Sequence, residues 1–343
     1  MWQRLYKKQA IDKRNTERLY RRSMEYRRIS ERQIYAFLKQ LVCVTIIIAF
    51  AMSMASCSNN PDWQEQRSKT AKYLLEQIDD GSLPIEDGEW ALIGIKNSDV
   101  ELTKDHLDNY YDSVRAKIKS KKGVLSEDFY TEYARTALGV FLAGKDPKSV
   151  EGYNLIEKLN DYGIVLDQGV NASIYALIAS NYCGYKLNEE SESKYLDDIR
   201  AAFEDGGEAV SSKVPMDYCG MALQALAYYK DDSTQKATIN KIYELIEKKI
   251  KSGKNGVDLG SCESNAQVIL GLSAMGIDLE KDKRFIKDEE TLIDGMMKYA
   301  EEDGFAHIKG KKVNLLASQQ ALMALDSFVL AKDKKMLMPK NEI

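Results

Sequence analysis

A short apolar segment recurs six times along this chain of 343 residues. Each copy is rich in Ala, Gly and Leu, carries almost no charge, and is too short to cross a membrane. Aligned on a shared leucine, the copies follow one another at intervals of 46, 39, 46, 47 and 52 residues. The shared leucines are Leu92, Leu138, Leu177, Leu223, Leu270 and Leu322. A period of this size indicates one structural unit that is copied six times.

A second kind of segment lies between the copies. In residues 234–251, Ile239, Ile242, Ile246 and Ile250 form one stripe of a helix, and Lys and Glu cover the opposite face. Similar amphipathic segments lie near residues 63–79, 106–118, 148–162, 193–204 and 290–302. Alternating β-branched runs are absent after residue 57, so strands are not expected.

Six helices that are apolar on all sides therefore alternate with six that are apolar on one side. Helices covered on both sides form an inner layer, and helices covered on one side form an outer layer around it. Ala and Gly let the inner helices approach closely. The sequence predicts an all-α fold: an (α/α)6 toroid of six helical hairpins over residues 63–330, followed by a C-terminal tail at 331–343.

The charge is distributed unevenly. Residues 1–40 hold 12 Lys/Arg and 4 Asp/Glu, no charge occurs at 41–56, and the remainder has 37 basic and 49 acidic residues. The part expected to fold is thus acidic. Because phosphate binding needs a basic face, we expect no nucleic-acid partner.

Residues 41–57 resemble a signal-peptide core that ends in a bacterial lipobox. Met54-Ala55-Ser56-Cys57 places small residues before a cysteine that would be lipidated, and residues 58–62 would form a tether. An uncleaved signal anchor is the alternative. A start at Met24 would leave an ordinary basic n-region, so residues 1–23 are either a mis-assigned start or a cytosolic extension. The resemblance implies a lipid anchor at Cys57 on the extracytoplasmic face of the cell membrane.

Residues 264–286, 303–310 and 315–328 carry a resemblance to a known family. Their sequences, "SNAQVILGLSAMGIDLEKDKRFI", "DGFAHIKG" and "LLASQQALMALDSF", resemble the prenyltransferase and squalene-cyclase type toroid repeat, in the form found in bacterial cell-surface proteins. The resemblance is close over 255–330 and rests on periodicity over 63–254. Relatives with this fold include terpene cyclases, prenyltransferase β-subunits and cobalamin carriers. Since one fold hosts several functions, function has to be argued from individual residues.

The family's enzymes suggest one candidate metal site. The chain lacks the Asp-x-Asp-Asp run of the cyclases and the Cys-Gly-Glu-Gln of thioester domains. Protein prenyltransferases bind zinc through an Asp, a Cys two residues later and a distant His, and thiolate, carboxylate and imidazole are ordinary zinc ligands. The corresponding candidates here are Asp217, Cys219, Cys262 and His307. Their alternative roles are a helix N-cap for Asp217, core positions for the cysteines and a turn for His307.

A glycan-active enzyme is the second catalytic hypothesis. Six-hairpin α/α barrels also serve glycoside hydrolases, which need two carboxylates on either side of the scissile bond. Candidates at the starts of the inner helices are Glu132, Asp217 and Glu263, with Tyr130, Tyr175 and Tyr218 as sugar-stacking groups. Acids at helix N-termini also favour the helix dipole without any catalytic role.

A non-catalytic binding domain is the interpretation that needs the fewest special residues. Six helices in a ring leave a central gap, and their aligned N-termini favour an anionic or electron-rich group at one end. We expect a small molecule, a glycan or a surface protein as the partner, and zinc as the one possible cofactor. The residues expected to line this end are Asn171, Asp217, Tyr218, Cys219, Glu263, Asn265, His307 and Gln319.

Overall fold

The computed structural model describes residues 62–126, 129–163, 168–213, 215–254 and 256–341. The chain divides into two units, residues 1–59 and 60–343, and all described residues belong to the second. The basic region, the signal segment and Cys57 lie outside the described residues. Within the described residues there are twelve α-helices and four 3-10 helices, and β-structure is limited to isolated bridges. The all-α prediction is confirmed.

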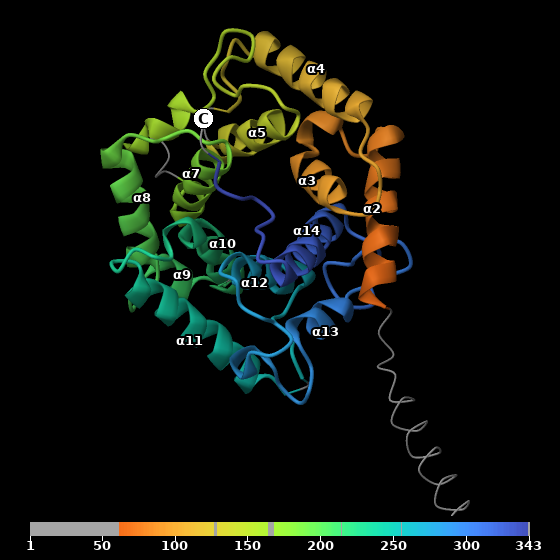
Figure 1. Ribbon diagram of the computed structural model, residues 1–343, viewed down its shortest axis with the longest axis vertical. Coiled ribbons are helices and arrows are strands. Elements are labelled where there is room, and N and C mark those ends of the chain that lie inside the picture. Colours follow the sequence, from red (N-terminus) through yellow and green to blue (C-terminus); the bar gives the residue numbers. More distant parts are fainter. Residues whose placement is uncertain (1–61, 127–128, 164–167, 214, 255, 342–343) are drawn as a thin grey trace, which may run out of the picture. The chain divides into compact units, whose positions relative to one another are not determined.

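Each of the six recurring apolar segments forms a helix. These are α3 (Glu89–Asn97), α5 (Thr131–Leu142), α7 (Val170–Tyr182), α10 (Pro215–Leu226), α12 (Cys262–Ala274) and α14 (Leu315–Lys332). We call them the inner helices, because the other α-helices lie around them (Figure 1). All six shared leucines are buried. In the described part of the chain, none of the helices has the length and apolarity needed to span a bilayer.

The outer helices are the remaining α-helices, and the longer ones among them cover the inner helices with a single face. They are α2 (Trp63–Asp79), α4 (Lys104–Ser120), α8 (Glu189–Ala202), α9 (Glu208–Ser211), α11 (Lys236–Ser252) and α13 (Leu292–Met297). On α11, the four isoleucines of the predicted stripe are buried. The 3-10 helices are η1 (Ile85–Asp87), η2 (Glu157–Asn160), η3 (Ala227–Tyr229) and η4 (Lys283–Phe285).

Residues 148–160 do not form the α-helix predicted near 148–162. They contain turns, an isolated bridge between Val150 and Tyr153, and η2. Glu151 and Gly152 both adopt positive φ, which an α-helix does not allow. The Asn154 side chain accepts hydrogen bonds from the next backbone N–H groups, an arrangement that competes with a helix. The apolar residues of this segment are therefore buried by turns rather than by an α-helix: Leu155, Ile156 and Leu159 are all buried.

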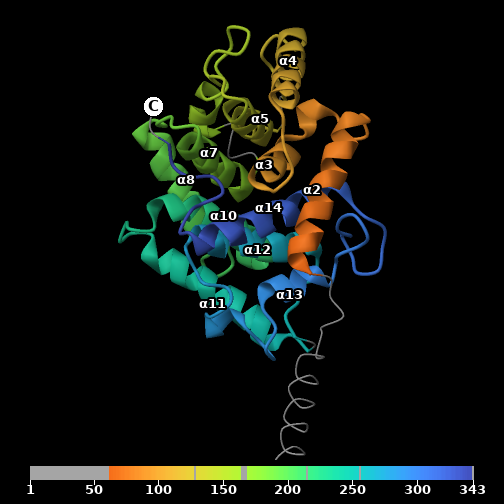
Figure 2. The same cartoon turned by 45° about the vertical axis from the view of Figure 1, so that its right-hand side comes forward.

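Contacts between the inner helices form a closed series. In order, α3 contacts α5, α5 contacts α7, α7 contacts α10, α10 contacts α12, α12 contacts α14, and α14 contacts α3 again. Outer helix α2 contacts both α3 and α14, the first and last members of the series. Glycine permits the closest approaches: Gly94 packs on Leu322, and Gly220 packs on the backbone at Gln267. Figure 2 shows the same nesting of inner and outer helices from a second direction.

Candidate functional site

The first turns of the inner helices gather on one side of the described unit. Ser264 in the first turn of α12 donates a hydrogen bond to Asp217 in the first turn of α10, with 2.5 Å between Oγ and Oδ1. One turn further along, the Tyr175 hydroxyl of α7 lies 3.4 Å from the Met221 sulfur of α10. Contacts between corresponding turns mean that these neighbouring helices run parallel. We call the surface formed by the first turns the N-terminal mouth.

Local capping explains why two of these helices begin where they do. Ser261 accepts a hydrogen bond from the N–H of Ser264 at 3.0 Å and so caps α12. Helix α7 has no side-chain cap from its own preceding residue. Glu208 of α9 instead accepts a hydrogen bond from the N–H of Val170 at 3.1 Å. An outer helix thus supplies one of the carboxylates at the mouth.

Asp217 is one of the acids at the mouth that the sequence had singled out. Its partner Ser264 also accepts a hydrogen bond from the Ser261 hydroxyl at 3.0 Å, which makes a short chain of three polar side chains. Burial raises the pKa of Asp217, the Ser264 hydrogen bond opposes this effect, and the negative charge of Glu263 raises it further. Asp217 is therefore a carboxyl group with increased affinity for a proton.

Glu263 and His307 form a second pair. Nδ1 of His307 lies 2.7 Å from Oε2 of Glu263, and the side chain of Glu263 is only 12% exposed whereas that of His307 is 55% exposed. The N–H of Cys262 donates to the carbonyl oxygen of His307 at 3.3 Å, which ties the loop before α14 to the start of α12. His307 thus lies between Glu263 and solvent.

Glu89 and Arg135 form a third pair that the sequence did not reveal. Glu89, the first residue of α3, is buried, and Nη2 of Arg135 on α5 donates to its Oε2 at 3.2 Å. Burial raises the pKa of Glu89, and the positive charge of Arg135 opposes that effect. Nε of Arg135 is buried and has no hydrogen-bond partner in the described residues. The guanidinium group therefore keeps unused donor capacity beside the mouth.

Aromatic side chains meet at the centre of the inner helices. The rings of Trp90 on α3 and Tyr175 on α7 lie 5.6 Å apart, although α5 separates these helices in the contact series. Tyr175 continues to Met221 through its hydroxyl. Burial raises the pKa of Tyr175 to about 12, so the hydroxyl stays protonated at neutral pH. All three side chains are only partly buried.

A row of glutamine side chains crosses the next turns of the inner helices. Nε2 of Gln224 on α10 donates to Gln267 on α12 at 2.8 Å, and Nε2 of Gln267 donates to Gln320 on α14 at 3.0 Å. Amide groups can both donate and accept, so such a row satisfies itself. Gln224 and Gln267 are buried, and Gln320 is partly exposed.

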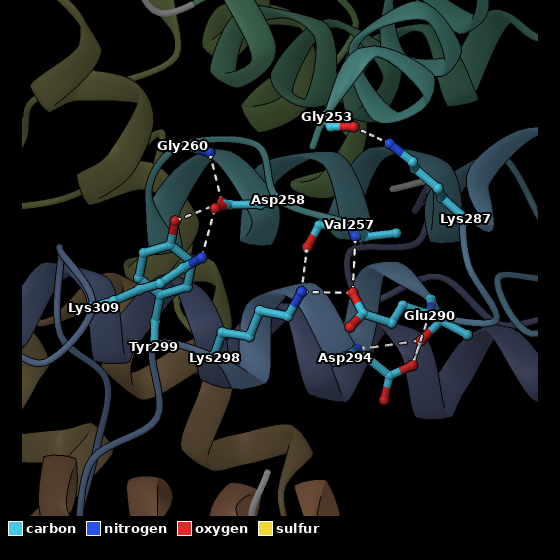
Figure 3. Close-up of polar contacts among 11 residues, drawn as sticks. Gly253, Val257, Asp258, Gly260, Lys287, Glu290, Asp294, Lys298, Tyr299 and Lys309 are labelled. Atoms are coloured by element: carbon cyan, nitrogen blue, oxygen red, sulfur yellow. Dashed lines mark hydrogen bonds and ion pairs between the residues drawn. The ribbon is translucent and has the colours of Figure 1, made fainter. Parts of the chain in front are cut away.

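A charged network holds the loop that leads into α12 (Figure 3). Asp258 accepts hydrogen bonds from the Tyr299 hydroxyl at 2.7 Å and from Lys309 Nζ at 2.6 Å. Burial alone would raise the pKa of Asp258, but these two donors bring it below its ordinary value. Glu290 accepts a hydrogen bond from the N–H of Val257 at 2.9 Å. The network fixes the turn that presents the serines of α12 to the mouth.

The predicted zinc site on Asp217, Cys219, Cys262 and His307 is not formed. In the described residues, no three His, Cys, Asp or Glu side chains come together so as to hold a metal ion. Both cysteines are fully buried, and the Cys262 thiol faces the carbonyl oxygen of Ala317 at 3.9 Å. Burial raises the pKa of Cys219 to about 12, which disfavours the thiolate that zinc needs. The cysteines are core residues here.

The other predicted mouth residues differ in accessibility. Asn171 and Tyr218 are partly exposed, and the oxygen of the Asn171 side chain is buried without a hydrogen-bond partner in the described residues. Asn265 is fully buried and donates to the carbonyl oxygen of Ser261 at 2.7 Å. Gln319 is also buried. Only part of the predicted set is therefore open to a ligand from solvent.

The residues proposed for glycan chemistry also separate. Glu132 is partly exposed at the start of α5. Tyr130 is buried and stacks on Tyr133 with 5.3 Å between ring centroids, so it is a packing residue. Asp217 and Glu263 remain the acids whose charges influence each other at the mouth.

The alignment of the six copies contains information that could have predicted these contacts, including those of Ser264, Trp90 and Met221. Asp217 and Ser264 both lie six residues before the shared leucine of their copies, and this equal register brings them together. Trp90, Tyr175 and Met221 all lie two residues before theirs. Reading the copies position by position would have grouped these side chains.

Comparisons with protein-family models, with curated proteins and with solved structures found no match to this chain.

Proposed function

We propose that the chain is a membrane-anchored lipoprotein on the extracytoplasmic face of the cell membrane, whose helical unit is an (α/α)6 toroid of the terpene cyclase and prenyltransferase type. The closed series of contacts among the inner helices supports the toroid. The resemblance of residues 255–330 supports the family, and the lipobox-like sequence that ends in Cys57 supports the anchor.

The toroid acts as a non-catalytic binding domain that takes its ligand at the N-terminal mouth. One observation carries this proposal: Asp217 is hydrogen-bonded to Ser264 and Glu263 to His307, and the partly exposed rings of Trp90 and Tyr175 lie against each other among the same inner helices. Such a surface offers partly exposed acceptors and donors for hydroxyl groups, and partly exposed rings for stacking. A hydroxyl-rich ligand, such as the end of a glycan, fits it best.

A glycan-active enzyme is the second candidate, and a specific observation favours it. Asp217 has a raised pKa next to the charge of Glu263. Glycoside hydrolysis needs an acid whose pKa is raised and a second carboxyl group near it. Asp217 would then protonate the leaving group, and Glu263 would act on the sugar or on water.

The two candidates are separated by exposing the full chain to a panel of soluble oligosaccharides and measuring retention and new reducing ends. Binding without new reducing ends is expected, and Asp217→Asn combined with Glu263→Gln should weaken retention at least tenfold. Glu244→Gln on the exposed face of α11 is the matched control. New reducing ends that the double variant abolishes would favour the enzyme. A panel that gives neither binding nor turnover contradicts both.

The anchor has its own test. Cells that express the full chain should incorporate a labelled fatty acid into it, and Cys57→Ser should abolish this incorporation, because Cys57 is the residue that would carry the lipid. Incorporation that persists in the variant, or no incorporation into the unmodified chain, would contradict the lipid anchor.

A further inference from the structure

The segment that follows α14 crosses the C-terminal ends of the inner helices. We call residues 336–341 the strap, and Figures 1 and 2 show it running from the end of α14 toward α7. It has no helix or strand of its own. Leu337 and Met338 are buried, with 6% and 5% of their surface exposed, whereas Pro339 and Lys340 are exposed. The strap is thus an extended peptide with two apolar side chains turned into the unit.

Hydrogen bonds fasten the strap at two points. The backbone N–H of Asn341 donates to the carbonyl oxygen of Asn181 at 3.1 Å, and its side-chain Nδ2 donates to that of Tyr182 at 2.6 Å. Carbonyl groups in the last turn of a helix lack partners within the helix, so Asn341 caps α7. The Tyr228 hydroxyl donates to the carbonyl oxygen of Met338 at 2.8 Å.

The surface beneath the strap has an apolar part and a polar part. A small cavity of about 10 Å³ remains under Leu337 and Met338, lined from α12 by Leu270 and Ala274. A polar pocket of about 400 Å³ opens at the other end of the strap, between Lys340 and the Glu192 side chain of α8. We call this whole surface the strap site.

The strap is held weakly compared with the helices it covers. It gains the burial of two side chains and three hydrogen bonds, while fixing six backbone residues costs conformational entropy of the same order. The inner helices, in contrast, are buried along most of their length and hold their own hydrogen bonds. The strap can therefore leave its site while the helices stay folded.

We propose that the strap is a releasable intramolecular ligand, and that the strap site binds an extended peptide of a partner protein with two adjacent apolar side chains followed by a helix-capping Asn. The strap itself is the argument for this occupant, because it shows which backbone and side-chain groups the site accepts. This interaction is separate from the N-terminal mouth and does not rest on the function proposed for it.

A synthetic peptide with the sequence of residues 334–341, KKMLMPKN, tests the proposal. The full chain with Leu337→Ser and Met338→Ser should bind the labelled peptide at least tenfold more tightly than the unmodified chain in an anisotropy titration. In the unmodified chain the tethered strap competes at an effective concentration that reaches the millimolar range. Lys340→Ala, an exposed change in the strap, should leave binding as in the unmodified chain. A peptide with serine at both apolar positions should not bind.

Equal binding to both chains, or no binding to a double variant that keeps its helical circular dichroism, would overturn the proposal. If the variant fails to fold, hydrogen exchange on the unmodified chain tests whether the strap leaves its site while α14 stays folded. Strap amides, including that of Asn341, should exchange through openings that leave α14 protected. Exchange of the strap and α14 at one common rate would show that the strap leaves only on global unfolding, which also overturns the proposal.

Discussion

Asp326 is a buried carboxyl group that links the last inner helix to the first outer helix. It is fully buried on α14, and its Oδ1 accepts a hydrogen bond from Nε of Arg67 on α2 at 2.6 Å. Its Oδ2 is buried without a partner in the described part of the chain. Burial raises the pKa of Asp326 to about 7; Arg67 opposes this effect, and the charge of Asp99 adds to it. The group therefore titrates far above an aspartate of the unfolded chain.

This difference predicts a pH dependence of stability. Because the folded state binds the proton more tightly, the contribution of Asp326 is fully present below about pH 4 and is lost as the pH rises toward 7. Each unit of pKa difference corresponds to about 1.4 kcal/mol in the free energy of unfolding. Asp326→Asn should flatten the profile of that free energy across this window, measured by urea unfolding, whereas the exposed Asp231→Asn should not. Parallel profiles for Asp326→Asn and the unmodified chain would contradict the assignment.

Helix positions follow from the sequence where burial alone decides them. Every recurring segment is a helix, because a helix that is apolar on all sides is stable only where other helices cover it on all sides. The prediction at 148–162 was wrong because positive φ at Glu151 and Gly152 overrides the apolar spacing. The sequence placed Asp217 and Glu263 at the starts of two inner helices, and both lie in the first turns of α10 and α12. Their partners Ser264 and His307 were not assigned to them, because pairing depends on the register between helices, which segment spacing alone does not specify.

The close contact between α10 and α12 gives a prediction at the same scale. A Cβ atom on Gly220 would overlap with the backbone carbonyl of Gln267, and backbone cannot move aside as a flexible side chain does. Gly220→Ala should therefore lower the free energy of unfolding by about 1–3 kcal/mol. Gly163→Ala is the matched control, since its Cβ would meet nothing nearer than 3.9 Å. Equal denaturation midpoints for the two variants would mean that α10 and α12 accommodate the added Cβ atom without a loss in the free energy of unfolding.

For the helical unit as a whole, the decisive feature is that the last inner helix returns to the first hairpin. Helix α14 contacts both α2 and α3. Arg67 of α2 also donates to the carbonyl oxygen of Asn97, at the end of α3, at 2.7 Å. The Trp63 ring of α2 packs edge-on against Phe328 of α14, with centroids 5.3 Å apart. The contacts of α14 with α2 and α3 join residues that are more than two hundred positions apart in the chain, so opening either end exposes core from both.

The unit should therefore unfold in a single transition, with the same urea midpoint by the fluorescence of Trp63 and of Trp90. Trp63 lies where α2 meets α14, and Trp90 lies at the centre. Chains that keep only one of them, with the other and Trp2 replaced by Phe, should give coincident urea transitions by fluorescence and by circular dichroism. Arg67→Ala removes the hydrogen-bond donor to the buried Asp326 side chain and should move both transitions to lower urea together. If the fluorescence of Trp63 changed at a lower urea concentration than that of Trp90, the first hairpin would unfold independently. The contacts of α14 with α2 and α3 would then contribute little to the stability of the unit.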